Sequence, residues 1–299
     1  MTRLRRIAWV AGIALAGAVV GASPSSAYFE TMEVGARGVA LGKTHVALAD
    51  DASAVHWNPG GLPFLDRGQV ILAQYRPHQA MDLATHFAAV SLPVGRMSMW
   101  SAWSHTGVPD AVSEDMLYAG AGTVLRWRQV RIGVGANVKL ARVAYHSPAA
   151  TASGELSGLG SETRAAFDAG VLAILNPRLR VGAVVRSIGR PSFEFVPGGG
   201  ATGLRVEREA GVSWRWHPES AVAAAVIGDE DGRPTPVVGA EVVFHRVFAL
   251  RVGMGDLKYF GGVGIMSDRW VVDLAFSTHN TLGISSMASV VIPFGRARE

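Results

Sequence analysis

Cysteine is absent from this chain of 299 residues, so disulfide bonds, thiolate metal sites and a cysteine nucleophile are all excluded. Charged residues are scarce as well. They make up 17% of the chain, whereas about 25% is usual for soluble domains. Glycine, with 36 residues, and tryptophan, with 8, are plentiful by contrast. This composition is unusual for a soluble enzyme and suits close-packed strands with aromatic residues near a membrane interface.

The chain also lacks a strong excess of charge of one sign, although its isoelectric point of about 9.7 suggests one. Of the 28 basic residues, Arg3, Arg5 and Arg6 lie within residues 1–27, which contain no Asp or Glu. The remainder therefore carries 25 basic residues against 24 acidic ones. Because no basic field remains, we expect no nucleic-acid partner.

Residues 1–27 have the three parts of a secretory signal. Arginines precede an apolar run from Ile7 to Gly21, and a small-residue cleavage site, Ser25-Ser26-Ala27, precedes Tyr28. A retained membrane anchor is the alternative, but the apolar run is short for a span. Arg5-Arg6 also fits twin-arginine export of a folded protein, whereas the fold argued below requires an unfolded one. We therefore expect a cleaved signal peptide.

After residue 27 no apolar stretch approaches the roughly 20 residues of a membrane-spanning helix. From Gln69 onwards the chain instead alternates with a period of two. In residues 131–140 every even position is apolar, and the odd positions carry Arg, Gly, Asn and Lys. Residues 210–217, 248–255 and 270–277 repeat the pattern. Such alternation is typical of strands that have one apolar face and one small or polar face.

About fourteen strands follow from this pattern. They are 69–76, 83–92, 96–105, 116–127, 130–144, 163–175, 179–189, 207–216, 220–228, 236–244, 248–254, 260–266, 270–277 and 285–293. Short turns alternate along the whole chain with mostly longer and more polar links, notably 106–115, 145–162, 190–206 and 229–235. An up-and-down barrel in an outer membrane has short periplasmic turns and longer outside loops, and an even strand number returns both ends to the periplasm. We therefore predict an all-β fold, an antiparallel transmembrane β-barrel of about 14 strands in the outer membrane of a Gram-negative bacterium.

Residues Gly35 to Leu62 resemble neither the signal nor the strands. Small and apolar residues there are interrupted by glycines, by Asp50-Asp51 and by a tight turn at Asn58-Pro59-Gly60-Gly61. The side chains of a barrel of roughly eight strands already fill its interior. A barrel of about fourteen strands therefore encloses more space than its wall side chains can fill. We predict that this stretch forms an N-terminal plug, or hatch, in the lumen. The candidate hatch residues are Gly35, Gly38, Gly42, Asp50, Asp51, Asn58, Pro59 and Gly60.

The predicted organisation has four parts. They are a signal peptide at 1–27, the plug at 28–66, the transmembrane barrel at 67–294 and a C-terminal tail at 295–299.

The run GARGVALGKTHVALADDASAVHWNPGGL at Gly35 to Leu62 resembles the amino-terminal signature of the PorV/PorQ group of outer-membrane proteins, within the FadL-like family of fatty-acid and hydrocarbon transporters. The segments 167–191, 238–244 and 272–295 resemble the same group. The resemblance implies a fourteen-stranded barrel with an N-terminal hatch in its lumen. Two features depart from the family pattern: Gly60 stands where alanine is usual, and the chain continues five residues past Phe294.

The spacing of residues gives little indication of a catalytic or metal-binding site. His45 and His56 flank Asp50-Asp51, which would suit a metal site, but we favour acids that turn or cap the hatch and histidines that pack in the lumen. Neither a Gly-x-Ser-x-Gly elbow nor a His-Glu-x-x-His pair occurs. We expect no enzyme activity, no cofactor and no metal, with a membrane-embedded hydrolase as the alternative.

Charged residues on the small or polar strand faces predict a polar lumen, because Arg or Lys facing lipid at mid-depth costs about 2–4 kcal/mol. The candidate lumen-facing charges are Arg131, Lys139, Arg142, Asp168, Arg180, Arg186, Arg215, Arg251 and Asp273. Tryptophans are expected at the membrane interface or on the lipid face. These tryptophans are Trp100, Trp103, Trp127, Trp214, Trp216 and Trp270.

Two functions remain open from the sequence. The first is transport: a plugged barrel that passes hydrophobic small molecules across the outer membrane. The alternative is a non-transporting barrel that acts as the partner or shuttle subunit of a secretion or surface-attachment machine. The expected partners are outer-membrane lipid and either hydrophobic small molecules or a secretion or surface protein.

Overall fold

The computed structural model describes residues 29, 32–80, 82–109, 111–146, 160–195, 201–228, 234–279 and 282–298. The predicted signal peptide lies outside the described residues, and so do parts of all four of the predicted long links. No helix in the described part is long and apolar enough to cross a bilayer.

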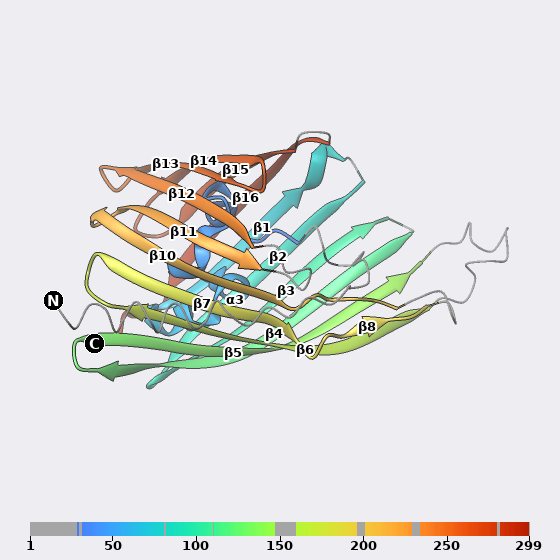
Figure 1. Ribbon diagram of the computed structural model, residues 1–299, viewed down its shortest axis with the longest axis horizontal. Helices are drawn as coiled ribbons and strands as arrows, with labels where there is room; N and C mark the ends of the chain where they lie inside the picture. Colours follow the sequence, from blue (N-terminus) through green and yellow to red (C-terminus); the bar gives the residue numbers. More distant parts are fainter. Residues whose placement is uncertain are drawn as a thin grey trace.

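The described residues form a closed barrel of fourteen antiparallel strands, which confirms the predicted fold (Figure 1). The barrel strands are β1 (Gly68–Arg76), β2 (Ala84–Val94), β3 (Met97–Val108), β4 (Val112–Trp127), β5 (Val130–Tyr145), β6 (Ser161–Ile174), β7 (Leu179–Ile188), β10 (Glu207–His217), β11 (Ser220–Gly228), β12 (Thr235–Phe244), β13 (Phe248–Gly255), β14 (Lys258–Met266), β15 (Val271–His279) and β16 (Gly283–Phe294). Each strand pairs with its neighbour along the chain, β7 pairs with β10, and β1 closes the ring on β16.

A small two-stranded sheet interrupts the order between β7 and β10. It consists of β8 (Ser192–Phe193) and β9 (Thr202–Gly203), and it lies within the predicted link 190–206. One 3-10 turn, η3 (Pro77–Gln79), follows β1.

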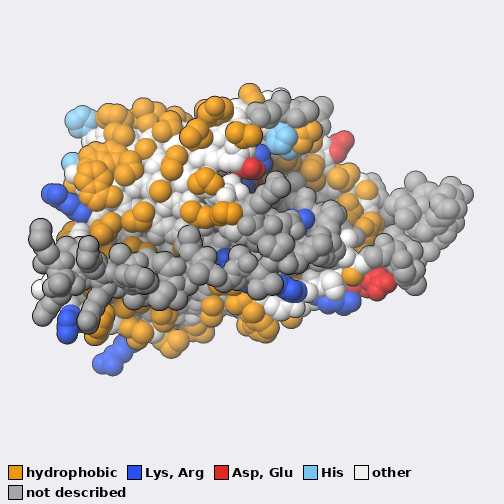
Figure 2. Space-filling view, viewed as in Figure 1, with side chains coloured by type: hydrophobic (Ala, Val, Ile, Leu, Met, Phe, Trp, Pro, Cys, Tyr) orange, Lys and Arg blue, Asp and Glu red, His pale blue; other side chains and the backbone are white. Residues whose placement is uncertain are grey.

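Alternation along each strand separates the two faces of the wall. In β5, Val138 and Leu140 are 48% and 45% exposed, while Asn137 and Lys139 are 2% and 3% exposed. Most large apolar side chains thus point outward, while charged and small ones point into the lumen together with a few large ones such as Phe87 and Trp100. Hydrophobic side chains cover much of the described outer surface in Figure 2, and Lys and Arg side chains project at the end where the short turns lie. The exterior is therefore suited to hydrocarbon.

The connections at the two ends of the barrel are less unequal than predicted. The β12–β13 turn and the other predicted short turns lie at one end, where β1 begins and β16 ends (Figure 1). At the opposite end β3 and β4 remain paired up to Val108 and Val112, so the predicted link 106–115 shortens to residues 109–111. Only residues 256 and 257 join β13 to β14. The prediction that short and long links alternate along the whole chain was therefore wrong.

Residues 33–66, here called the lumenal segment, lie inside the barrel and provide 15 of the 42 buried hydrophobic residues of the described part. The segment contains α2 (Ala36–Ala40), η1 (Thr44–Ala47), α3 (Ala54–Trp57) and η2 (Pro59–Phe64). Its apolar side chains are buried except for the half-buried Phe64, and Val39, Leu48 and Val55 are among the most deeply buried. The segment packs on strands of both halves of the barrel, from β4 to β7 and from β10 to β16.

Glycines on the inner wall allow this close packing. A Cβ added at Gly182 of β7 would lie 2.1 Å from the carbonyl oxygen of Val46, and one at Gly239 of β12 would lie 2.2 Å from that of Leu41. Side chains at these wall positions would push the lumenal segment away. The backbone of the segment therefore rests directly on the backbone of the wall.

Candidate functional site

The predicted hatch glycines Gly35, Gly38 and Gly42 lie at the start of the lumenal segment. Gly35 and Gly42 have φ values of 69° and 66°, in the left-handed region that glycine adopts readily. A Cβ at Gly38 would lie 2.7 Å from the indole nitrogen of Trp57, and one at Gly42 would lie 2.9 Å from the carbonyl oxygen of Val238. Trp57 of the segment therefore leaves no room for a side chain at Gly38, and the wall leaves none at Gly42.

Asn58 connects the second half of the lumenal segment to the wall. Its side-chain oxygen accepts a hydrogen bond from the backbone of Gly60 at 3.0 Å and so caps η2, in which Pro59 is the first residue. Its amide nitrogen donates to the carbonyl oxygen of Val46 at 2.7 Å and to that of Val171 in β6 at 3.0 Å. One buried side chain therefore joins η2, η1 and the barrel.

Asp50 lies at the centre of a cluster of arginines. Its carboxylate pairs with Arg37 of the lumenal segment, with Arg180 of β7 at 3.2 Å and with Arg215 of β10 at 2.6 Å. Burial alone would raise the pKa of Asp50, but the three guanidinium groups hold it well below its usual value. The carboxylate is thus a fixed negative charge that ties the segment to two strands.

Arg37 extends this cluster across the lumen. It donates two hydrogen bonds to Glu241 of β12, each of 2.9 Å. Glu241 also accepts from Arg251 of β13, and Arg251 in turn donates to Asp273 of β15 at 2.6 Å. Asp50, Arg37, Glu241, Arg251 and Asp273, here called the lumenal ion chain, therefore connect the segment to the opposite side of the wall.

A second group of ion pairs surrounds Arg186 of β7. Its guanidinium donates to Glu207 at 2.9 Å, to Glu209 at 3.0 Å and to the carbonyl oxygen of Trp57 at 3.1 Å. Arg186 and Glu209 are 5% and 2% exposed. Each of the three guanidinium nitrogens donates to an acceptor of the chain itself. Arg186 therefore holds α3 in place rather than presenting a free charge.

Asn137 of β5 organises a third contact between wall and segment. Its amide donates to the carbonyl oxygen of Val55 at 2.8 Å and to Asp168 of β6 at 3.1 Å, and Asp168 pairs with Lys139 at 2.8 Å. Trp100 donates to the Asn137 side chain at 2.6 Å and is 5% exposed. The expected membrane-facing position of Trp100 was therefore wrong: β3 points this indole into the lumen. The other five predicted tryptophans, Trp103, Trp127, Trp214, Trp216 and Trp270, are exposed.

Two of the predicted lumen-facing arginines lie near the ends of β5. Arg131 is exposed, and its guanidinium lies 5.7 Å from the ring centre of Phe64 in the lumenal segment. Arg142 is exposed on the outward face near the other end, where it donates to Ser161 at 3.4 Å. Arg142 follows Lys139 by three residues, so the two cannot share a strand face. Its inward placement in the prediction was an error of register.

His45, Asp50 and Asp51 come together with their potential ligand atoms within 4.8 Å of one another. The carboxylates, however, already face arginines: Arg37 lies against both of them, and Asp50 has two further guanidinium partners. A divalent cation at this point would meet three fixed positive charges, which makes the donor set unsuitable for a metal. His45 is fully buried and packs against Trp57, with ring centres 6.3 Å apart.

A cavity of about 280 Å³ lies in the lumen beside the segment. Its lining residues are Phe29, Met32, Glu33, Lys43, His56, Trp57, Met116, Lys139, Arg186, Ser187, Leu204, Arg205, Glu207 and Ile227. Lys43 pairs with Glu33 at 2.5 Å, and burial together with nearby Arg186, Lys139 and Lys43 holds the pKa of His56 well below its usual value. The cavity is mixed in character, with apolar surfaces between internally paired charges.

Sequence reasoning missed Arg37, Glu241 and Glu209. Glu241 is the single carboxylate of β12, and Glu209 follows Glu207 by two residues in β10. Each lies on the same strand face as a glycine, Gly239 and Gly211 respectively. A lone carboxylate in a membrane strand is a signal of a lumenal partner, because a charge facing lipid is costly. Arg37 had no comparable signal, since it stands in a segment without strand alternation.

A closed barrel with an apolar outer wall, a charged interior and a filled lumen has the fold of an outer-membrane β-barrel. No protein-family model matches the chain, and no curated protein sequence matches it. Solved structures do match. The deltaS2 mutant of the TodX monoaromatic hydrocarbon channel is 13% identical, with a TM-score of 0.63, over 89% of this chain and 100% of that one. The CymD monoaromatic hydrocarbon channel is 13% identical, with a TM-score of 0.61, over 90% of this chain and 99% of that one. At this identity the likeness concerns the fold.

Proposed function

We propose that this protein is a FadL-like outer-membrane barrel that passes hydrophobic small molecules, with the lumenal segment as its gate. The observation that carries the proposal is the position of this segment, which fills the lumen of a barrel that shares its fold with two monoaromatic hydrocarbon channels. A passage through such a barrel requires the segment to move. The contacts that hold the segment in place should therefore control the rate of transport.

The construction of the segment is compatible with movement. It consists of short helical turns, none longer than six residues, joined by glycines and by the Asn58 turn. Several of its connections to the wall are polar, among them the ion pairs of Asp50 with Arg180 of β7 and Arg215 of β10. Polar contacts can be exchanged for water when a gate opens, whereas exposed apolar surface cannot be compensated in this way.

An uptake assay tests the proposal. Liposomes that contain the purified protein should take up a labelled fatty acid or alkane faster than protein-free liposomes. The Asp50→Asn variant should take it up faster still, because Arg37, Arg180 and Arg215 then lose their shared carboxylate. Glu219→Gln is the matched control, since Glu219 pairs only with the exposed Arg246 at a turn. Equal uptake with and without the protein would refute transport.

A second function, that of a non-transporting partner or shuttle subunit of a secretion or surface-attachment machine, is favoured by a different observation. The lumenal ion chain and the Arg186 group fasten the segment at several points, and the cavity beside it is lined by paired charges. A permanently sealed barrel needs such fastening and needs no apolar path. The resemblance of residues 35–62 to the PorV/PorQ group supports the same alternative.

Crosslinking in intact cells separates the two functions. A barrel of the second kind should be recovered with a secreted or surface-attached protein, and its Asp50→Asn variant should show no gain in uptake. Recovery of the barrel-assembly machinery alone would contradict it. The proposed export and location are checked in the same cells: the mature protein should begin at Tyr28, and it should show heat-modifiable migration in the outer-membrane fraction.

A further inference from the structure

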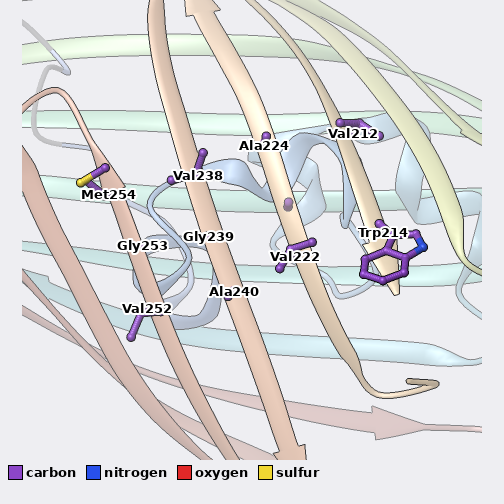
Figure 3. Close-up of a pocket in the computed structure, with 11 residues that line it drawn as sticks. Val212, Trp214, Val222, Ala224, Val238, Gly239, Ala240, Val252, Gly253 and Met254 are labelled. Carbon is purple, nitrogen blue, oxygen red and sulfur yellow. The ribbon is translucent and has the colours of Figure 1, made fainter. Parts of the chain in front are cut away.

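An apolar groove of about 550 Å³ lies on the outer wall across β10, β11, β12 and β13 (Figure 3). Its lining residues are Val212, Trp214, Val222, Ala223, Ala224, Val238, Gly239, Ala240, Val252, Gly253 and Met254. The six large residues among them are all at least 40% exposed, on the outward face of their strands. Aliphatic groups, one thioether and one indole thus make up the surface of the groove.

The pairing of the four strands explains why the wall is hollow at this point. One row of paired residues crosses the wall as Val212, Ala224, Val238 and Met254. The row next to it runs Trp214, Val222, Ala240 and Val252. Each row holds a single alanine, and the two alanines lie on adjacent strands with an offset of two residues. Ala224 and Ala240 therefore form a low floor between taller side chains.

The inner face directly behind this floor carries small residues. Gly239 and Gly253 point inward, and a Cβ added at either would lie 2.2 Å from the backbone of the Leu41–Gly42 turn. The ribbon of the lumenal segment passes behind these strands in Figure 3. The floor of the groove is therefore a single layer of backbone that the lumenal segment supports from inside, so the hollow is a lasting feature of the wall.

The position of the groove decides what can occupy it. It is continuous with the apolar outer wall, the surface that such a barrel presents to the hydrocarbon of the bilayer. The molecules beside such a surface are lipid acyl chains, and an empty hollow would lose dispersion contacts along its lining. Its volume falls within the range of about 300–1,000 Å³ that is typical of small-molecule sites.

We propose that this groove binds one acyl chain of a membrane phospholipid, as a defined site rather than as part of the general lipid layer. The chain lies over Ala224 and Ala240, between Val212, Trp214 and Val222 on one side and Val238, Val252 and Met254 on the other. This inference does not depend on transport, because it concerns the outer face of the wall only.

A phosphatidylcholine with a photoreactive diazirine in one acyl chain tests the proposal. After reconstitution of the full-length mature protein and illumination, peptide mass spectrometry should find labelling of β11 and β12 at least about fivefold above that of β14 and β15, because the groove holds the chain through more contacts than a wall without a hollow does. The outward residues Val263 and Ile265 of β14 and Val272 and Leu274 of β15 are all large and exposed. Equal labelling of both regions in the unaltered protein would overturn the proposal.

Filling the groove provides the second arm. The double variant Ala224→Phe, Ala240→Phe should lose the excess labelling. The control is Ala119→Phe, Ala136→Phe, whose two alanines are also exposed, on adjacent strands and offset by two residues; it should keep the excess. Persistence of the excess in the filled groove would overturn the proposal. So would a crosslinked dimer in the unaltered protein that disappears in the filled variant, since a second copy would then be the occupant.

Discussion

Arg37 and Glu241 are joined by two parallel hydrogen bonds of 2.9 Å that connect the lumenal segment to β12. Both side chains are more than four-fifths buried, and Glu241 also faces Arg251. Bidentate pairing of this kind fixes orientation as well as distance. The pair therefore joins the lumenal segment to the barrel wall, and it is the contact from which the behaviour of the segment can be predicted best.

The Glu241→Gln variant should loosen the lumenal segment without opening the barrel. Loss of the carboxylate leaves Arg37 and Arg251 as buried charges with weaker partners, and removal of one member of a buried pair typically costs about 3 kcal/mol. Hydrogen exchange in residues 33–66 should rise, while exchange in the strands stays the same. The control Glu219→Gln should change neither. Unchanged protection of the segment in the Glu241 variant would show that the ion chain does not hold it.

The Gly182→Ala variant should displace the segment by steric contact alone. The added methyl would lie 2.1 Å from the carbonyl oxygen of Val46, which is too close for the backbone to remain in place. Limited proteolysis should cleave residues 33–66 faster than in the unaltered protein. Gly228→Ala is the control, because its nearest heavy atom is 3.8 Å away. Equal cleavage in both variants would contradict the close packing of segment and wall.

Acid should weaken the seating of the segment in two steps. Burial, with Arg186, Lys139 and Lys43, lowers the pKa of His56 in the seated state. A displaced segment therefore binds that proton more readily, and seating begins to weaken as the pH falls below about 6.5. The carboxylate of Asp50, whose pKa is also lowered, stabilises the seated state above about pH 4, and this contribution is lost as the pH falls further.

Hydrogen exchange of residues 33–66, corrected for the intrinsic pH dependence of amide exchange, measures both steps. His56→Gln should remove the upper step and keep the lower one. Asp50→Asn should reduce the lower step, from a starting point that is already less protected. A single step below pH 4 in the unaltered protein would mean that His56 takes up its proton without moving the segment.

The absence of cysteine allows a covalent lock to be introduced cleanly. The backbone nitrogen of Ala36 donates to the Ser289 hydroxyl at 3.1 Å, so the two positions face each other between segment and β16. The double variant Ala36→Cys, Ser289→Cys should form an internal disulfide under mild oxidation in isolated outer membranes. A gel shift that a reductant reverses would report it, and each single variant should show none. Absence of the disulfide in heat-modifiable protein would contradict the position of the segment.

The barrel could be predicted from the sequence because its signal repeats in every strand. Alternation of apolar with small or charged residues follows from the contrast between lipid outside and lumen inside, and each strand carries it independently. Two of the three corrections, those of Trp100 and Arg142, follow from the same two-residue period. Trp100 and Trp103 are three residues apart, as are Lys139 and Arg142, so neither pair can share a face.

The contacts of the lumenal segment could not be predicted from the alternation of residues. Asp50 meets arginines more than a hundred residues away, and which guanidinium reaches it depends on how the segment lies in the closed barrel. The segment has no period of its own that would orient Arg37 toward Glu241. Its small residues and glycines indicated that it packs inside something, but the partners of each side chain emerge only when wall and segment are together.

The locked variant also tests the central claim, that the lumenal segment is the gate of a passage for hydrophobic molecules. Uptake of labelled alkane into liposomes should be measured for Ala36→Cys, Ser289→Cys in its oxidised form and again after reduction. The account predicts slow uptake while the disulfide holds the segment and recovery to the level of the unaltered protein after reduction. Equal uptake in the two forms, with the disulfide verified, would contradict it.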